Sequence, residues 1–536
     1  MTDFSSRSLL PLIGILLLSG VIVTAGTTLL PLDAHEAYVV QTTREMQDNK
    51  NWIVPVFNNH PRLKKPPLNY WITGAAAWIT GSLDHVQPWH GRVASIIAAL
   101  ALIILAFLLA NKLYNRQLAL VSALLLATSL GLFNYSHDAR PDMLYSLFCT
   151  TGYTAFIFAW KAEQHSKRML FVYSMWLAWA FATLTKGPHM PAMYLVACII
   201  CCRVSGLSWK NILELTRPFS GILLFICVAA PWWIMLNHAL GDGGLHGTQL
   251  SGTLLTIKFN NIFKFYYFYR PLLLVLPWLV FIPFTIRWLM YAKEFNNANL
   301  MLCLLILVPA VFLTFGSQER WFYLLPSIVP MIILLAAGVT RLINDTLQEH
   351  SKYWLKIMIP GLVLSALIIF IALIIGSEPA TTGNKIIFSV CMILLVLILC
   401  GSLVYKGTPG INHVLLACLA YAIMYIGLGF STIGWSKERF ENYYLAKYAS
   451  EIKNKDIQVA TIRVTPDIYV YYIGNPITDF KSVKEFLDEY QSNPGRNYLI
   501  IMKQDDIKLL PADINWNSLY TTDIPGKSKS LVEIIR

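Results

Sequence analysis

Apolar segments of about 20 residues recur along this chain as far as residue 433, and they limit the possible folds more than any other feature. A helix needs about 20 apolar residues to cross the roughly 30 Å hydrocarbon core of a bilayer. The 536 residues are 56% hydrophobic and only 13% charged, which excludes an ordinary soluble multidomain protein. The sequence therefore predicts an all-α polytopic membrane protein.

We expect about thirteen membrane spans. They are residues 9–30, 92–111, 118–135, 142–160, 169–185, 188–203, 216–236, 270–290, 298–315, 322–341, 354–376, 385–405 and 412–433. The first apolar segment is longer than the core of a usual signal peptide, and no small-residue cleavage site follows it. We therefore expect it to be retained as the first helix.

Lysine and arginine in the short loops predict the orientation. The short loops on one side carry fifteen of these residues and those on the other side carry seven. The richer side is expected in the cytoplasm, which places the N-terminus inside and, with an odd number of spans, the C-terminus outside. The net charge of +12 fits contact with anionic membrane lipids. Nucleic acid is not an expected partner, because no basic stripe interleaved with aromatic residues lies outside the apolar segments.

Two long regions leave the membrane on the external side. In the loop 31–91, the pattern predicts a helix over His35–Gln47 and an interfacial helix over Leu68–Ile79. Residues 434–536 have the composition of a small α/β domain. Its expected strands are Ile457–Arg463, Ile468–Ile473 and Asn497–Lys503, and its expected helices are Glu438–Lys453 and Ser482–Gln491. We therefore divide the chain into a membrane domain, 1–433, and an external α/β domain, 434–536.

Polar residues gather at the external helix ends. They are Asp33, His35 and Glu36 after the first span, Asp138, Arg140 and Asp142 before the fourth, Lys186 after the fifth, Lys264 before the eighth, and Arg320 and Tyr323 before the tenth. We expect Asp33, His35 and Glu36 to be exposed polar groups beside a helix end. Any one of the polar residues could be a solvated helix end, and Asp138 fits solvation or a pair with Arg140. Asp142, at the mouth of a span, is expected to face the protein interior because a carboxylate exposed to lipid is costly. Their convergence on one face indicates a site.

The mixture of charges at this face suggests a chemistry. Arginine and lysine suit a lipid-linked phosphate, and nearby carboxylates suit general-base or acceptor-positioning work. Together they point to group transfer from a polyprenyl-phosphate carrier. The sequence has no GxxxxGK[ST], HExxH, GxSxG or dinucleotide-binding motif, which argues against nucleotide chemistry.

An ordered set of motifs resembles a known family. The acidic motif after the first span is followed by REM-x5-W-x-x-P at 44–55 and KPPLNYW at 65–71. Arg92, Pro141-Asp142, LTKGP at 184–188, Pro231-Trp232-Trp233, Pro277-Trp278 and YLLP at 323–326 then follow in order. This set is similar to the lipid-phosphate-dependent GT-C glycosyltransferases, and most of all to the branch that holds the aminoarabinose transferase of lipid A. The protein O-mannosyltransferases are more distant relatives.

The resemblance implies an inverting transfer of a sugar, such as 4-amino-4-deoxy-L-arabinose, from undecaprenyl phosphate to a periplasmic acceptor such as lipid A. It also implies a bacterial inner-membrane protein whose C-terminus lies in the periplasm. By this resemblance the expected catalytic residues are Asp33, His35, Glu36 and Asp142, and the expected substrate-binding residues are Lys65, Tyr70, Lys186, Arg320 and Tyr323.

Three positions depart from the family pattern. His35 stands where the first acid of the family's Asp-Glu pair is expected, and Asp33 is a possible substitute. Lys64 replaces the acid that often precedes KPPL, and the histidine expected before the eighth span is missing. We therefore expect no metal site and no cofactor.

Two other functions stay open. The sugar could go to another envelope glycan or to a protein. A transporter or flippase for a lipid-linked substrate would need inverted repeats and broken helices at matching positions of two halves, which the sequence does not display. A sensor whose external domain binds a ligand is a third alternative.

Overall fold

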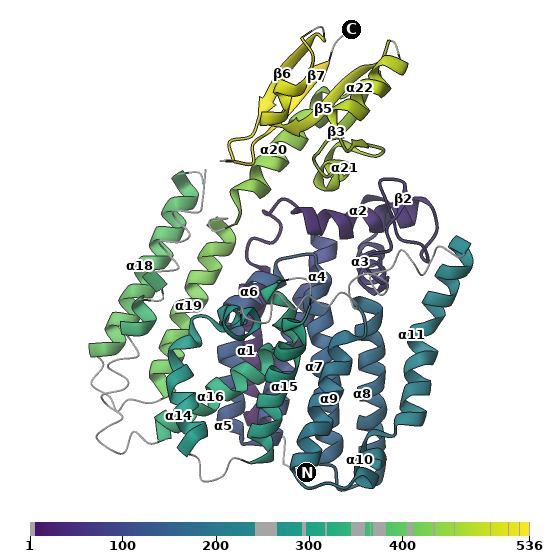
Figure 1. The fold of residues 1–536 in the computed structure, drawn as a ribbon. Coiled ribbons are helices and arrows are strands. Elements are labelled where there is room, and N and C mark those ends of the chain that lie inside the picture. The colour runs from purple at the N-terminus through teal and green to yellow at the C-terminus, as the bar shows by residue number, and fades with distance from the viewer. Residues whose placement is uncertain are drawn as a thin grey trace.

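A computed structural model gives the fold (Figure 1). It describes residues 6–534 except 242–264, 292–295, 317–318, 345–359, 365, 368–381, 405–410, 432–434, 455, 494, 513 and 525. Most described residues form a bundle of roughly parallel helices, and an α/β region of residues 435–534 lies beyond one end of that bundle (Figure 1). We call this part the C-terminal α/β region.

The bundle consists of apolar helices that follow the expected spans closely. They are α1 Ser6–Thr24, α4 Pro88–Leu113, α5 Arg116–Ala127, α6 Leu130–Ser136, α7 Pro141–Trp160, α8 His165–Thr185, α9 His189–Val204, α10 Trp209–Thr216, α11 Pro218–Leu240, α14 Ile282–Tyr291, α15 Asn297–Thr314, α16 Ile328–Asn344, α18 Thr382–Val404 and α19 Ile411–Ser431. Short helical segments α13 Tyr266–Tyr269, η4 Arg270–Val275, η5 Trp278–Phe281 and η6 Trp321–Ser327 lie between some of them.

Fewer helices than expected pass as full membrane spans. Within the described ranges, six helices are long and apolar enough to cross a bilayer, and two bent pairs raise the number to eight. The expected span 118–135 breaks by 52° between α5 and α6, and the expected span 270–290 bends by 112°. The sequence did not predict this bend within 270–290, which lies at Pro277, where a proline interrupts the helical hydrogen bonding. Most of the expected span 354–376 lies outside the described residues. The chain is a multi-span membrane protein.

The first and last helices of the bundle approach each other at glycine. A Cβ on Gly429 would lie 2.3 Å from the carbonyl oxygen of Ala25, and one on Gly26 would lie 1.9 Å from the carbonyl oxygen of Gly429. Only residues without side chains allow two backbones to pack this closely inside a membrane bundle. The end of α1 is therefore fixed against α19, immediately before the segment that leads to α2.

The segment between α1 and α4, residues 25–87, folds over the same end of the bundle as the C-terminal α/β region (Figure 1). Helix α2, Ala34–Asp48, is followed by the hairpin of β1 Val56–Phe57 and β2 His60–Pro61 and by α3, Leu68–Ile79. A short 3-10 turn, η1 Leu83–His85, leads into α4. The two helices expected in this loop are confirmed, the second with its expected ends.

The C-terminal α/β region has a mixed five-stranded sheet in the order β4-β3-β5-β7-β6. The strands are β3 Ile457–Ile462, β4 Thr478–Phe480, β5 Asn497–Lys503, β6 Trp516–Thr521 and β7 Lys529–Ile534. The helices are α20 Lys437–Ile452, α21 Asp467–Ile473, α22 Val483–Ser492 and the short η8 Gln504–Leu509. Strand β3 is parallel to β4 and β5, whereas β7 is antiparallel to β5 and β6.

One expected strand in this region is wrong. Residues 468–473, rich in aromatic and β-branched side chains, form helix α21 instead of a strand. Pro466 stands at its N-cap, and Gly474 ends it with a φ of +96°. Ile468, Tyr469 and Ile473 are all buried in a core shared with other helices, so tertiary packing overrides the local strand propensity.

The C-terminal α/β region is packed tightly on the segment between α1 and α4. One apolar core contains Leu32, Ala37 and Val40 of that segment together with Leu445 and Ile468. Polar contacts reinforce it: the Asn58 side chain exchanges hydrogen bonds of 2.7 and 2.8 Å with the backbone of Ile477. The Leu32 amide also donates to the Tyr472 hydroxyl at 3.0 Å. This contact brings residues about 400 positions apart in the sequence to the same end of the bundle.

Candidate functional site

The acidic motif after α1 builds the start of α2. Asp33 is the N-cap, and its Oδ1 accepts from the Glu36 amide at 2.8 Å. Glu36 in turn accepts from the Asp33 amide at 3.1 Å, which completes a capping box. The spacing Asp-x-x-Glu therefore has a local structural cause, because it satisfies two amides at the helix start that lack intrahelical partners.

Glu36 is completely buried between two arginines. Its Oε1 lies 2.8 Å from Arg92 Nε and accepts from the Ala139 amide at 2.8 Å, and its Oε2 contacts the guanidinium of Arg439. Burial would raise the pKa of Glu36, but Arg439 and Arg92 outweigh this effect and lower it to about 2. The expectation that this acid is exposed is wrong, since Glu36 is 0% exposed. Its oxygens are engaged by protein donors, which suits a positioning residue better than a base.

The loop between α6 and α7 carries Asp138 and Arg140. The Ser95 hydroxyl donates to the Asp138 carbonyl at 2.7 Å and fixes the loop against α4. The Asp138 carboxylate lies 3.5 Å from Arg439 Nη1 and 4.0 Å from Arg140 Nη1. Asp138 is 6% exposed, so it is not a solvated loop end, and the expected pair with Arg140 is present.

Asp142 lies in the first turn of α7 and faces the protein interior, as expected. It is 5% exposed, and its Oδ1 lies 2.6 Å from Lys186 Nζ at the C-terminal end of α8. Its Oδ2 lies 3.4 Å from Arg140 Nε. Pro141 starts α7, so the carboxylate also lies near the positive end of the helix. A buried acid thus has two cationic partners.

Aromatic rings surround the ammonium group of Lys186. Its Nζ lies 4.5 Å from the ring centre of Tyr323, 5.5 Å from that of Phe322 and 5.6 Å from that of Tyr145. Attraction between a cation and the face of an aromatic ring stabilises the charge in a site that excludes water. Tyr323 and Lys186, expected to contact substrate, are therefore in contact with each other.

Arg320 and Lys65 complete the positive side of this group. The Arg320 amide donates to the Tyr267 hydroxyl at 3.2 Å, which places Arg320 at the start of η6 beside Tyr323. Lys65 is half-buried in the loop before α3. Partial burial, followed by the positive charge of Lys186, lowers the pKa of Lys65 to about 7, and Arg320 contributes to the same shift. The three cations are therefore close enough to influence one another.

The charged groups form one continuous series of alternating sign. In order they are Arg92, Glu36, Arg439, Asp138, Arg140, Asp142 and Lys186. They come from α4, α2, α20, the loop before α7, α7 itself and the end of α8. We call this series the charge ladder. Because each buried charge has an opposite neighbour, the ladder avoids the large cost of an isolated buried ion.

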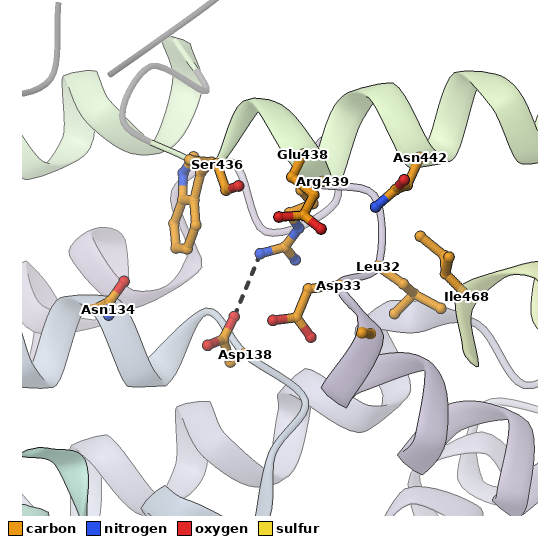
Figure 2. Close-up of a pocket in the computed structure, with 11 residues that line it drawn as sticks. Leu32, Asp33, Asn134, Asp138, Ser436, Glu438, Arg439, Asn442 and Ile468 are labelled. Carbon is orange, nitrogen blue, oxygen red and sulfur yellow. Dashed lines mark hydrogen bonds and ion pairs between the residues drawn. The ribbon is translucent and has the colours of Figure 1, made fainter. Parts of the chain in front are cut away.

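A polar pocket of about 400 Å³ opens beside the middle of the ladder. Figure 2 shows the Asp33 carboxylate next to the Asp138–Arg439 pair, with α20 on the opposite side. Its polar lining includes Asp33, Asn134, Asp138, Glu438, Arg439 and Asn442. Asp33 thus has one oxygen capping α2 and lies at the edge of an open space, unlike Glu36.

The structure brings most, but not all, of the expected site residues together. Asp142, Lys186, Arg320, Tyr323 and Lys65 form one group. His35, on the first turn of α2, is exposed and within electrostatic reach of Arg140 and Asp142.

Tyr70 contacts a different set of residues. It is 1% exposed, its hydroxyl accepts from Arg62 at 2.9 Å, and its ring packs with Val39 and Met46. Lys64 is exposed, and Lys264 lies outside the described residues. Among the described side chains, histidine, cysteine and acidic residues do not gather in a group of three that could hold a metal ion.

Sequence reasoning missed Arg439, which joins two acids of the ladder. Arg439 comes only a few residues after α19, the last helix of the bundle, and this position near a helix end was a signal that the sequence offered. No signal in the sequence indicated the pairing of Arg439 with Glu36 and Asp138, because 403 and 301 positions separate these partners along the chain.

Comparisons with known proteins find relatives of this chain in sequence and in fold. Residues 64–235 match the family model of dolichyl-phosphate-mannose-protein mannosyltransferases. The chain is 24% identical over 350 residues to the undecaprenyl phosphate-alpha-4-amino-4-deoxy-L-arabinose arabinosyl transferase of Pectobacterium atrosepticum, and 26% identical over 323 residues to that of Shewanella sediminis. These alignments cover 62% and 58% of this chain. They span 61% and 57% of the relatives, which is less than two thirds of their length.

Solved structures extend the similarity to nearly the whole chain. The crystal structure of ArnT from Cupriavidus metallidurans bound to undecaprenyl phosphate matches with a TM-score of 0.75 at 14% identity, covering 99% of this chain and 98% of that one. An oligosaccharyltransferase from Archaeoglobus fulgidus matches with a TM-score of 0.51 at 10% identity, covering 92% of this chain and 69% of that one. In fold the chain is thus similar to ArnT, and in sequence it is similar to the aminoarabinose transferases and protein mannosyltransferases, which confirms its resemblance to the lipid-phosphate-dependent GT-C glycosyltransferases.

Proposed function

We propose that this protein is a membrane glycosyltransferase that moves a sugar from an undecaprenyl-phosphate carrier to a periplasmic acceptor. The proposed sugar is 4-amino-4-deoxy-L-arabinose or a close analogue, and the proposed acceptor is lipid A. The observation that carries this proposal is the contact of Lys186 with both Asp142 and Tyr323, beside Lys65 and Arg320. It occurs in a fold similar to a protein solved with undecaprenyl phosphate.

The cationic residues are proposed to hold the carrier phosphate. Lys65, Lys186 and Arg320 provide ammonium and guanidinium donors, which bind phosphate through charge-assisted hydrogen bonds. The ring of Tyr323 lies 4.5 Å from Lys186 Nζ and would fix the direction of that lysine. As the bond from the anomeric carbon to the phosphate oxygen breaks, the phosphate keeps the electron pair, and these cations stabilise the added negative charge.

Asp142 and Asp33 are proposed to act on the acceptor side. In an inverting transfer the acceptor oxygen attacks the anomeric carbon from the face opposite to the phosphate. A hydroxyl acceptor needs a carboxylate to take its proton. A phosphate acceptor is already ionised near neutral pH, so there the carboxylates would orient rather than deprotonate. His35, exposed at the start of α2, is proposed to contact substrate, and Glu36 is proposed to position α2 and its neighbours.

The finer architecture is also part of the proposal. We infer about thirteen spans, an inner-membrane location, a cytoplasmic N-terminus and a periplasmic C-terminus. We also propose a division into a membrane domain, 1–433, and a periplasmic α/β domain, 434–536. The lysine and arginine count of the short loops supports this orientation. In this proposed orientation the whole charge ladder would lie on the periplasmic face.

A second acceptor class has specific support, because the matched family model describes protein mannosyltransferases. Sugar transfer to a protein or another envelope glycan would use the same carrier site. The two readings differ only in the acceptor.

Reconstitution tests the proposal. Purified protein in proteoliposomes receives undecaprenyl-phosphate-aminoarabinose with lipid A, and mass spectrometry follows both lipids. We expect sugar-modified lipid A and free undecaprenyl phosphate from wild type and from Lys484→Ala, an exposed lysine on α22. Asp142→Asn should lower the rate by about 10²-fold or more. Movement of intact donor across the bilayer without release of the carrier would identify a flippase instead, and transfer only to a protein would replace lipid A as acceptor.

A further inference from the structure

The C-terminal α/β region contributes a buried side chain to the candidate site. Arg439, in the first turn of α20, is 6% exposed and extends from that helix toward Asp138 (Figure 2). Its Nε donates to the Pro31 carbonyl, and its two terminal nitrogens contact Glu36 and Asp138. One side chain thus joins α20 to the end of the first span, to α2 and to the loop before α7.

The position of Arg439 is fixed by packing on both sides. Residues of α20 and α21 share an apolar core with α2, and Arg44 of α2 donates to the Tyr471 carbonyl at 3.4 Å. The Arg44 guanidinium also lies 3.8 Å from the ring centre of Tyr471. These contacts hold α20 and α21 against α2, and they keep the backbone of Arg439 beside the loop that carries Asp138.

Asp138 is the group through which Arg439 can act. Asp33 and Glu36 of α2 act on it with negative charge, while Arg439 of α20 and Arg140 of its own loop act with positive charge. Glu438 lies in the same pocket. Arg140 has its Nη1 4.0 Å from Asp138 and its Nε 3.4 Å from Asp142, so the two acids share one guanidinium.

We propose that Arg439 is a positioning residue: it favours the negatively charged form of Asp138, and charged Asp138 holds Arg140 away from full pairing with Asp142. If Asp138 becomes neutral, Arg140 loses one of its two acids and pairs with Asp142 alone. Asp142 is then less able to act on the acceptor. The C-terminal α/β region thus sets the electrostatic state of the site through a single arginine.

The balance at Asp138 is a close one. Burial, together with Asp33 and Glu36, raises the pKa of Asp138 to about 7 in spite of Arg439 and Arg140. Loss of the Arg439 charge should therefore leave Asp138 mostly neutral at neutral pH. The consequence for catalysis rests on the proposed function, but the titration of Asp138 does not.

The first experiment needs no substrate. Unfolding of the full-length protein in detergent is followed against pH for wild type, Asp138→Asn, Arg439→Met and Arg439→Lys. A carboxyl whose pKa is higher in the folded state binds an extra proton there, so folding stability falls as pH rises from about 4 to about 7. We expect Asp138→Asn to lack this fall.

In Arg439→Met the fall in folding stability should continue to a pH about one to three units higher than in wild type. The pH dependence of Arg439→Lys should be close to that of wild type. Arg496→Met, which removes an exposed guanidinium that donates to the uncharged Gln458 within the C-terminal α/β region, is the matched control and should follow the wild-type curve. If Arg439→Met does not fold, the difference between wild type and Asp138→Asn still decides whether Asp138 titrates near 7. Identical pH dependence of those two proteins would overturn the proposal.

The second experiment uses transfer activity. We expect kcat of wild type to fall as pH drops through about 7. In Arg439→Met the same fall in kcat should occur at a pH about one to three units higher. The KM for the lipid-linked donor should stay within about twofold, because Lys65, Lys186 and Arg320 are unchanged. A lower kcat with an unmoved pH limb would show a purely structural role for Arg439 and contradict the proposal. If wild type transfers no sugar, the proposed function fails, while the stability titration still judges the role of Arg439.

Discussion

Lys186 Nζ lies 2.6 Å from Oδ1 of Asp142, where the end of α8 meets the start of α7, although the two residues are 44 positions apart in the sequence. Both side chains are at least nine-tenths buried, and Arg140 contacts the other carboxylate oxygen. The burial of this pair has two consequences. Each group stabilises the charged form of the other, and neither is simply a solvated helix end.

The first prediction concerns the energy of this pair. Removing one partner of a buried ion pair leaves an uncompensated charge and costs about 3–5 kcal/mol. Lys186→Met should therefore lower the free energy of unfolding more than the double variant Lys186→Met/Asp142→Asn does. A double-mutant cycle in detergent, read by chemical unfolding, measures this coupling. Additive effects of the two changes would show that the contact contributes no stability.

The second prediction concerns Glu36. Because Glu36 is fully buried and accepts from Arg92 and Arg439, Glu36→Gln should lower the free energy of unfolding by about 3–5 kcal/mol. A carboxyl with a lowered pKa stabilises the fold above its unfolded pKa, and this stability is lost as pH falls from about 4.5 to about 2. The variant should lack that acid-side loss. Wild-type stability of Glu36→Gln, with lower transfer activity, would instead support a direct catalytic role.

The third prediction uses the pKa of Lys65, which lies near 7. Phosphate binding favours the protonated lysine, so donor affinity should weaken above pH 7, by up to about tenfold per pH unit. The donor is a phosphodiester and does not itself titrate in this range. Lys65→Arg stays charged and should bind equally well from pH 6 to pH 9. Equal pH dependence of wild type and Lys65→Arg in a binding assay would exclude Lys65 from the phosphate site.

The fourth prediction concerns sidedness. A cysteine at Ser482, exposed at the start of α22, should react with a membrane-impermeant thiol reagent in intact spheroplasts. A cysteine at Ser166, exposed on the first turn of α8, should react only after the membrane is broken. Peptide mass spectrometry separates these sites from the nine native cysteines. Labelling of Ser166→Cys alone would place the charge ladder in the cytoplasm and exclude a periplasmic acceptor.

Local patterns predicted much of the fold. The ends of α3 and of strand β5 were predicted without error, because Pro67 precedes the apolar run of α3 and the polar residues Arg496 and Gln504 bound β5. The segment 468–473 was predicted as a strand because tertiary burial, not local propensity, decides its conformation. The bend near Pro277 was missed since hydropathy shows the length of an apolar segment and not its continuity.

The sequence predicted which residues belong to the candidate site better than it predicted which of them are in contact. Asp142, Lys186 and Tyr323 come from separate spans, and the sequence placed all three on one face. Which of them touch is decided by helix packing, which no local pattern encodes. The same limit explains why Arg439 was missed and why Glu36 was expected to be exposed: their pairing depends on the docking of α20 over α2.

The central claim is sugar transfer from an undecaprenyl-phosphate carrier to lipid A, and mass spectrometry of lipid A tests it most directly. Cells that lack the gene are complemented with wild type, Asp142→Asn or Lys484→Ala. We predict aminoarabinose-modified lipid A with wild type and with Lys484→Ala, and its loss with Asp142→Asn and with no complement. Unchanged lipid A in all four strains, with the sugar found on another glycan or on protein, would contradict the proposed acceptor. Modified lipid A in cells that carry only Asp142→Asn would contradict the proposed site.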